Sequence, residues 1–300
     1  MTQTSSIRRI TVPAPDRGTD LEVRITAPTT GENLPVVIFS SGFGFSMDAY
    51  GPLVDHWAEN GFVVIQPTHL DSVSLGIAPT DPRTPLMWRY RITDFRLILD
   101  HLDVVVDALP GLAGRVDTQR IAVAGHSYGA ITASALLGAR VLAPAGDPDE
   151  DFTDTRVSAG ALIALAGLAG QELTPLAEQF FPFMNPDFEH FTAPALFVAG
   201  DADQSALSTR GPDWWTDAYH NTEGQKSLLT VYGATHAFGG IHAYGTIPQT
   251  PTDNPATVAL MQHATTAYLQ SALGVDASAW PQAQAAITAD PAPAARVDTK

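Results

Sequence analysis

Three residue types that together support nucleophilic catalysis follow one another along this sequence: a serine, an aspartate and a histidine. The serine is Ser127, in the stretch AVAGHSYGA between Gly125 and Gly129. A serine hydroxyl is a weak nucleophile and needs a neighbouring general base, which a third group orients. A G-x-S-x-G pattern places such a serine on a sharp turn between a strand and a helix, with the acid and the histidine later in the chain. The pattern predicts acyl transfer; the alternative is a plain turn whose serine caps a helix.

The best-placed histidine is His236, in TVYGATHAFGG, because it directly follows the last predicted strand of the central sheet. His242 is the second candidate, but it lies further from that strand. For the acid we predict Asp203, in FVAGDADQSAL, since the acid commonly sits three residues beyond the glycine that starts the turn, here Gly200. Asp201 is expected to cap the turn instead.

Acyl transfer also needs donors for the negative charge that develops on the carbonyl oxygen. One donor is expected from the backbone N–H of Tyr128, directly after the serine. The second is expected from the N–H of Phe43, in the glycine-flanked loop SSGFGFSMD. The side chain of His126 is expected to point away into the core as a structural residue. His69 and His190 could line a pocket.

The elements that must position these residues alternate between strand and helix patterns. Apolar runs and alternating segments predict strands at residues 7–15, 20–28, 34–42, 62–70, 120–125, 158–167, 193–200 and 226–233. Helical patterns cover residues 48–61, 88–109, 128–140 and 254–274. The predicted fold class is therefore α/β: a mostly parallel central sheet with helices on both faces and an antiparallel N-terminal edge.

The chain is predicted to form one domain over residues 1–275, since no linker or internal repeat interrupts it. Residues 167–191 depart from the alternation and are a candidate pocket wall or lid. Residues 276–300 are rich in Ala and Pro, which predicts a loosely ordered tail.

Aromatic residues point to the substrate. Phe180, Phe181 and Phe183 lie where a segment leaves the carboxyl edge of the predicted sheet, so they could wall an apolar pocket. A small satellite core is the alternative. Trp214 is a similar candidate for substrate binding. Three arginines near the start of the longest predicted helix are expected as surface charge: Arg83, Arg89 and Arg91.

Composition narrows the function further. The 300 residues carry a formal net charge of −16, which disfavours nucleic acid and anionic membranes as partners. There is no cysteine, no His/Asp spacing typical of metal sites and no phosphate-binding loop, so we expect no metal and no organic cofactor. The N-terminus lacks an apolar signal segment and no run is long enough for a membrane helix, which predicts a cytoplasmic protein without membrane insertion. The expected partner is a small-molecule substrate. The sequence does not indicate an oligomeric state.

The sequence resembles the α/β-hydrolase superfamily in three motifs that follow in the same order: GHSYG, GDAD and GATHAF. The stretch SGFGFSMDAYGPLVDHWAENGFVVIQPTH is most similar to the group that holds bacterial homologues of platelet-activating-factor acetylhydrolase, chlorophyllase-like esterases and polyester hydrolases. This resemblance implies a serine esterase for an ester with an apolar portion, with catalytic residues Ser127, Asp203 and His236 and oxyanion donors at Phe43 and Tyr128. Two alternatives stay open: a lactone or amide hydrolase with the same triad, and a non-catalytic small-molecule binder on the same fold.

Overall fold

The computed structural model describes residues 2–142, 150–169, 172–181, 183–242 and 253–300. The strands are β1 (Thr4–Val12), β2 (Leu21–Pro28), β3 (Leu34–Ser40), β4 (Val63–Pro67), β5 (Val116–His126), β6 (Arg140–Val141), β7 (Val157–Ile163), β8 (Pro186–Asp187), β9 (Ala195–Gly200), β10 (Lys226–Val231) and β11 (Ala295–Thr299). The α-helices are α1 (Gly51–Glu59), α2 (Met87–Asp100), α3 (Leu102–Asp107), α4 (Tyr128–Leu136), α5 (Pro175–Phe180), α6 (Asp217–His220), α7 (Pro255–Ala272) and α8 (Ala279–Ala289). Short 3-10 helices are η1 (Pro15–Arg17), η2 (Val73–Leu75), η3 (Thr84–Leu86) and η5 (Pro212–Thr216).

A nine-stranded sheet forms the centre of the molecule, in the order β1-β2-β4-β3-β5-β7-β9-β10-β11. Neighbouring strands from β4 to β10 are parallel, whereas β1 and β2 pair antiparallel at one edge. Every residue of β3 is buried, as expected for a strand with helices on both sides. The predicted α/β class and the antiparallel N-terminal edge are confirmed.

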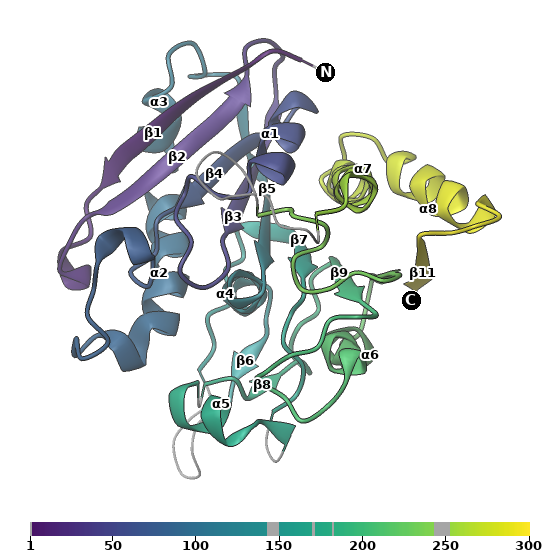
Figure 1. The fold of residues 1–300 in the computed structure, drawn as a ribbon. Helices are drawn as coiled ribbons and strands as arrows, with labels where there is room; N and C mark the ends of the chain where they lie inside the picture. The colour runs from purple at the N-terminus through teal and green to yellow at the C-terminus, as the bar shows by residue number, and fades with distance from the viewer. Residues whose placement is uncertain (1, 143–149, 170–171, 182, 243–252) are drawn as a thin grey trace.

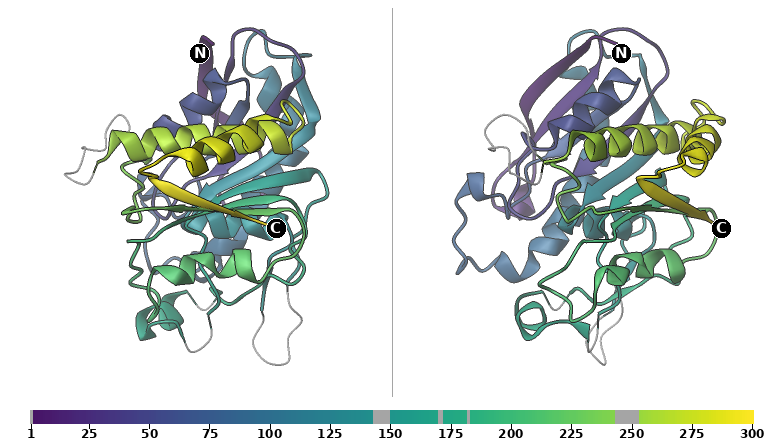
Figure 2. Two further views of the ribbon diagram at one scale, coloured as in Figure 1. Left: turned by 90° about the vertical axis from the view of Figure 1, so that its right-hand side faces the viewer. Right: turned by 45° about the vertical axis from the view of Figure 1, so that its right-hand side comes forward.

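Helices cover both faces of this sheet (Figure 1 and Figure 2). On one face α1 and α7 pack against each other, and the indole N–H of Trp57 donates to Thr265 Oγ1 at 2.9 Å. On the other face α2 packs against α4, which lies over β3, β5 and β7. Within the described ranges, no helix combines the length and the apolar character needed to cross a membrane.

The helix predicted over residues 88–109 is two helices in the structure. α2 and α3 meet at His101, whose φ of −120° and ψ of 28° are not helical. A ring N–H of His101 donates to the Leu97 carbonyl at 3.0 Å, and the same carbonyl accepts the backbone N–H of His101. The side chain thus competes with continued helical bonding, a local effect that the spacing of apolar residues does not reveal.

The expectation of a loosely ordered tail over residues 276–300 is wrong. α8 packs against α7, and β11 adds an antiparallel strand to the edge of β10, as Figure 2 shows. Trp280 anchors the segment: it is buried, packs on the Tyr268 ring at 5.6 Å and donates to Ser227 Oγ at 3.0 Å. Burial of one aromatic side chain removes a large apolar area from water, which composition alone does not show.

The carboxyl ends of the parallel strands meet at one edge of the sheet and bring distant parts of the sequence together. The loops that follow β3, β5, β9 and β10 carry, in turn, Phe43, Ser127, Asp203 and His236. Ligands of open α/β sheets bind at this edge.

Candidate active site

Ser127 occupies a strained turn between β5 and α4. Its φ of 57° and ψ of −121° lie in a region that residues with side chains rarely adopt. Ser127 is the N-cap residue of α4, yet its hydroxyl makes no capping hydrogen bond. The hydroxyl instead lies 2.9 Å from His236 Nε2. The alternative of a helix-capping serine is therefore wrong.

The two glycines of the motif let β5 and α4 approach closely enough to form this turn. A Cβ atom on Gly125 would lie 2.1 Å from the Gly129 carbonyl oxygen. A Cβ atom on Gly129 would lie 2.0 Å from the Ser40 carbonyl oxygen at the end of β3. Backbone atoms cannot relieve such contacts without a shift of a strand or a helix, so both glycines are packing requirements.

His236 joins Ser127 to Asp203 by hydrogen bonds. His236 Nδ1 lies 2.8 Å from Asp203 Oδ2, and His236 Nε2 lies 2.9 Å from Ser127 Oγ. Because a carboxylate only accepts, Nδ1–H of His236 donates to Asp203, and Nε2 accepts from the Ser127 hydroxyl. Asp203 is 1% exposed, whereas the His236 side chain is 41% exposed. The set can therefore take a proton from the serine while the serine attacks a ligand that arrives from solvent.

The second candidates for acid and base make other contacts. Asp201 accepts a hydrogen bond from Gly233 N–H at 2.6 Å, which ties the loop after β9 to the loop after β10. His242 packs its ring against Phe45, with 5.5 Å between the ring centroids. The geometry favours Asp203 and His236.

The backbone N–H groups of Phe43 and Tyr128 have no acceptor within the described part of the chain. Tyr128 directly follows Ser127, and its ring lies 6.1 Å from the Phe43 ring. The N–H of Gly44, one residue after Phe43, is already used, because it donates to Asp71 Oδ2 at 3.1 Å. Unused donors next to a nucleophile, held by fixed neighbours, are what a developing oxyanion requires.

Arg91 is buried beneath the Phe43 loop, so the expectation of surface charge is wrong for this residue. It forms a bidentate pair with Asp71 at 2.7 and 2.8 Å. It also donates to the carbonyls of Ser41 and Gly42 at 2.8 and 3.1 Å. Burial is the largest single effect and raises the pKa of Asp71, but the charge and hydrogen bonds of Arg91, together with backbone hydrogen bonds, outweigh it, and the pKa lies below its usual value. The pair fixes the backbone on either side of Phe43.

Replacement of Arg91 by methionine is expected to destabilise the fold strongly. Arg91→Met leaves the Asp71 carboxylate buried without its partner, at a cost of about 3–5 kcal/mol in the free energy of unfolding. Urea unfolding measured by far-UV circular dichroism gives this value. Arg8→Met is the control: the Arg8 side chain is 60% exposed and pairs with Asp48, which is 47% exposed, so a loss of only about 0–1 kcal/mol is expected. Equal losses in the two variants would contradict the role given to Arg91.

A second serine, histidine and aspartate are hydrogen-bonded in the same order. Ser40 Oγ lies 2.9 Å from His69 Nε2, and His69 Nδ1 lies 2.8 Å from Asp94 Oδ2. All three residues are fully buried, so a substrate cannot reach them, and the expectation that His69 lines a pocket is wrong. Burial and the charges of Arg91 and Arg17 hold the pKa of His69 well below its usual value. This set is part of the core under the Phe43 loop.

Four aromatic side chains, including Phe43 and Tyr128, pack against one another. Phe183 stacks on Tyr128 with 5.4 Å between ring centroids. Phe181 meets Phe43 at 6.4 Å and Phe183 at 6.1 Å. We call Phe43, Tyr128, Phe181 and Phe183 the aromatic wall. Because Tyr128 directly follows Ser127, the wall offers apolar surface beside the nucleophile.

Of the two tryptophans that follow the acid loop, Trp215 lies beside the histidine, whereas the substrate-binding candidate Trp214 does not. Trp214 is completely buried, and its indole N–H donates to the Leu168 carbonyl at 2.8 Å. Trp215 packs its ring 5.1 Å from the His236 ring and donates to the Asp203 carbonyl at 2.9 Å. The dipeptide indicates an aromatic residue here, but which ring faces the histidine depends on the path of η5.

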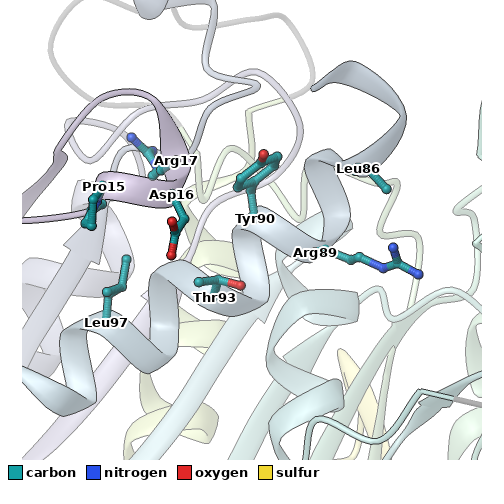
Figure 3. Close-up of a pocket in the computed structure, with 9 residues that line it drawn as sticks. Pro15, Asp16, Arg17, Leu86, Arg89, Tyr90, Thr93 and Leu97 are labelled. Atoms are coloured by element: carbon teal, nitrogen blue, oxygen red, sulfur yellow. The ribbon is translucent and has the colours of Figure 1, made fainter. Parts of the chain in front are cut away.

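Two hollows in the described part of the chain are lined by residues other than Ser127, Asp203 and His236. A hollow of about 380 Å³ lies between η1 and α2 (Figure 3), and its buried arginine, Arg17, is paired with Asp94 at 2.8 Å. A second hollow, of about 610 Å³, includes His190 in its lining. There Asp187, Glu189 and His190 bring three potential ligand atoms within 4.8 Å of one another. Acidic groups at a surface are common without an ion, so the expectation of no metal stays a prediction.

The fold and the serine on the strained turn between β5 and α4 define the class of this protein: it is an α/β-hydrolase. The model of the chlorophyllase family matches residues 3–175, more than half of the chain, and the protein belongs to that family. Platelet-activating factor acetylhydrolase from Cavia porcellus is 22% identical over 290 residues, which cover 82% of this chain and 59% of the relative. The chain therefore spans about 59% of the length of that relative.

Proposed function

We propose that this protein is a serine hydrolase that cleaves carboxylic esters with an apolar portion. The observation that carries the proposal is the hydrogen-bonded set of Ser127, His236 and Asp203 at a strained turn. Membership of the chlorophyllase family and similarity to an acetylhydrolase support ester hydrolysis.

In the first half of the reaction, Ser127 Oγ attacks the ester carbonyl carbon while His236 Nε2 takes the hydroxyl proton. The carbonyl oxygen becomes negatively charged and accepts hydrogen bonds from the N–H groups of Phe43 and Tyr128. Asp203 stabilises the imidazolium that forms. His236 then gives its proton to the leaving alcohol, the ester C–O bond breaks, and the acyl group stays on Ser127.

In the second half, water replaces the alcohol. His236 takes a proton from the water as the water attacks the acyl carbon, and the same two N–H groups stabilise the second oxyanion. The proton returns to Ser127 Oγ as the acyl bond breaks. The carboxylic acid leaves, and the enzyme is restored.

The aromatic wall is our proposal for the surface that contacts the apolar portion of the ester. Phe183 and Phe181 are half-buried, and their rings pack on the side chains of Tyr128 and Phe43, the two residues whose N–H groups are the proposed oxyanion donors. Phe180 is left out of this proposal because it projects from α5 with 60% of its surface exposed. Trp214 is left out because it is buried away from the surface.

Hydrolysis of p-nitrophenyl esters from acetate to laurate tests both the chemistry and the wall. We expect wild-type protein to turn over the short esters, and Phe183→Ala to shift the preferred acyl length upward by at least two carbons, because loss of the ring opens apolar space. Leu176→Ala removes an exposed side chain of α5 and should leave the profile unchanged. No turnover of any ester by folded protein would reject the esterase proposal, and an unchanged profile in Phe183→Ala would reject the wall.

A further inference from the structure

A buried chain of hydrogen bonds joins the Phe43 loop to the backbone of the proposed general base. Gly42 N–H donates to the Tyr50 hydroxyl at 3.1 Å. The Tyr50 hydroxyl lies 2.7 Å from His126 Nδ1. His126 Nε2 lies 2.8 Å from the His236 carbonyl oxygen. Tyr50 has no exposed area and His126 is 4% exposed, so water does not compete for these bonds.

The direction of every hydrogen bond in this chain is fixed. A carbonyl oxygen only accepts, so the proton of the His126 ring must be on Nε2, facing His236. Burial and the neighbouring His236 keep the pKa of His126 well below its usual value, which leaves Nδ1 without a proton. Nδ1 therefore accepts from the Tyr50 hydroxyl, whose oxygen is left to accept from Gly42. A charged His126 would leave the Tyr50 proton without an acceptor within the described residues.

The two ends of the chain are the two parts of the site that must keep a fixed distance. Gly42 directly precedes Phe43, whose N–H is a proposed oxyanion donor, and the His236 carbonyl belongs to the proposed general base itself. His126 directly precedes Ser127. Tyr50 has a left-handed backbone, with φ 65°, at the N-cap of α1. A residue with a side chain keeps this strained conformation only where the surrounding structure enforces it.

Resting on the proposed function, we propose that Tyr50 and His126 are positioning residues that hold the Phe43 N–H and the His236 ring in one geometry through this hydrogen-bond chain. Neither side chain touches the reacting atoms. Their effect arises because small displacements of a donor or a base from the productive geometry reduce turnover strongly.

Tyr50→Phe is the sharpest test, because it removes one hydroxyl and keeps the ring. We expect kcat for a p-nitrophenyl ester to fall about 10- to 100-fold, less than the loss of a complete oxyanion donor, while KM changes less than about threefold. Tyr268→Phe is the control, since Tyr268 is also a buried residue and packs on Trp280 rather than on any member of the hydrogen-bond chain. Its kinetic constants should match those of the wild type.

Nitrogen NMR of the His126 ring gives a second readout that does not depend on turnover. We expect the ring to stay neutral, with its proton on Nε2, through the pH range in which an ordinary histidine titrates, and the Phe43 amide shift to change in Tyr50→Phe. A proton on Nδ1, or titration near the ordinary histidine pKa, would overturn the proposal even if the protein hydrolysed no ester.

The kinetic outcomes separate this inference from the proposed function. If hydrolysis depends on Ser127 but Tyr50→Phe is as active as wild type, the positioning role is wrong and the function stands. Equal losses of kcat in Tyr50→Phe and Tyr268→Phe would also overturn the positioning role, because they would reflect the loss of a tyrosine hydroxyl in general. Absence of Ser127-dependent hydrolysis in the wild type would count against the proposed function. The tautomer of the His126 ring would then test the hydrogen-bond chain independently.

Discussion

Ser127→Ala is expected to lower ester turnover by at least about 10⁴-fold while the protein stays folded. The change removes Ser127 Oγ, which lies 2.9 Å from His236 Nε2, so neither covalent attack nor proton transfer from the hydroxyl can occur. Any remaining rate comes from the oxyanion donors and from substrate binding. Initial rates with p-nitrophenyl butyrate measure the loss, and far-UV circular dichroism checks the fold.

Ser40→Ala is the matched variant, because Ser40 makes the same contact to a histidine in a fully buried setting. We expect it to keep turnover and to lose about 1–3 kcal/mol of stability, since His69 is left with an unpaired ring nitrogen. Full activity in Ser127→Ala would contradict the assignment of the nucleophile. Ligand binding by wild type without any Ser127-dependent turnover would favour the alternative of a non-catalytic binder.

Asp203→Asn is expected to lower kcat by about 10⁴-fold with little change in structure. Asp203 Oδ2 accepts from His236 Nδ1 at 2.8 Å, which keeps Nε2 free of its proton and able to accept from Ser127. An asparagine amide can donate to Nδ1 instead, and the ring then carries its proton on Nε2, where it cannot act as the base. The same ester assay, run with equal amounts of folded protein, measures this loss.

Asp201→Asn provides the comparison for that loss. Asp201 stands two residues earlier, is exposed, and accepts from Gly233 N–H at 2.6 Å. An amide oxygen can accept the same bond, so we expect turnover within about threefold of wild type. A larger loss in Asp201→Asn than in Asp203→Asn would reverse the assignment of the acid.

Much of this architecture is predictable from the sequence, because the spacing of apolar residues and the short motifs are local features of the chain. Continuous apolar runs bounded by Gly or Pro predict β3 and β5, and the order of the three motif loops follows the order of the strands. The structure places His236 within hydrogen-bonding distance of both Ser127 and Asp203. A parallel sheet makes this possible, because every strand delivers its following loop to the same edge.

Features that depend on contacts between distant segments are harder to predict from the sequence. Arg91 lies on the helix face that also carries Trp88 and Phe95, both buried, and that spacing is a signal for burial, but its partner Asp71 follows another strand. Tyr50 has no sequence feature that marks it, because its role depends on where β5 places His126. The Ala- and Pro-rich composition of residues 276–300 predicts a loose tail, whereas one buried side chain, Trp280, anchors its packing.

The measurement that tests the central assignment most directly is the mass of the protein after exposure to a fluorophosphonate, followed by peptide mapping. A fluorophosphonate reacts with a serine only where a base and oxyanion donors activate it. We predict one adduct per chain, located on Ser127, absent in Ser127→Ala and formed much more slowly in Asp203→Asn. An adduct on any other residue, or ester hydrolysis by a protein that takes up no label, would contradict it.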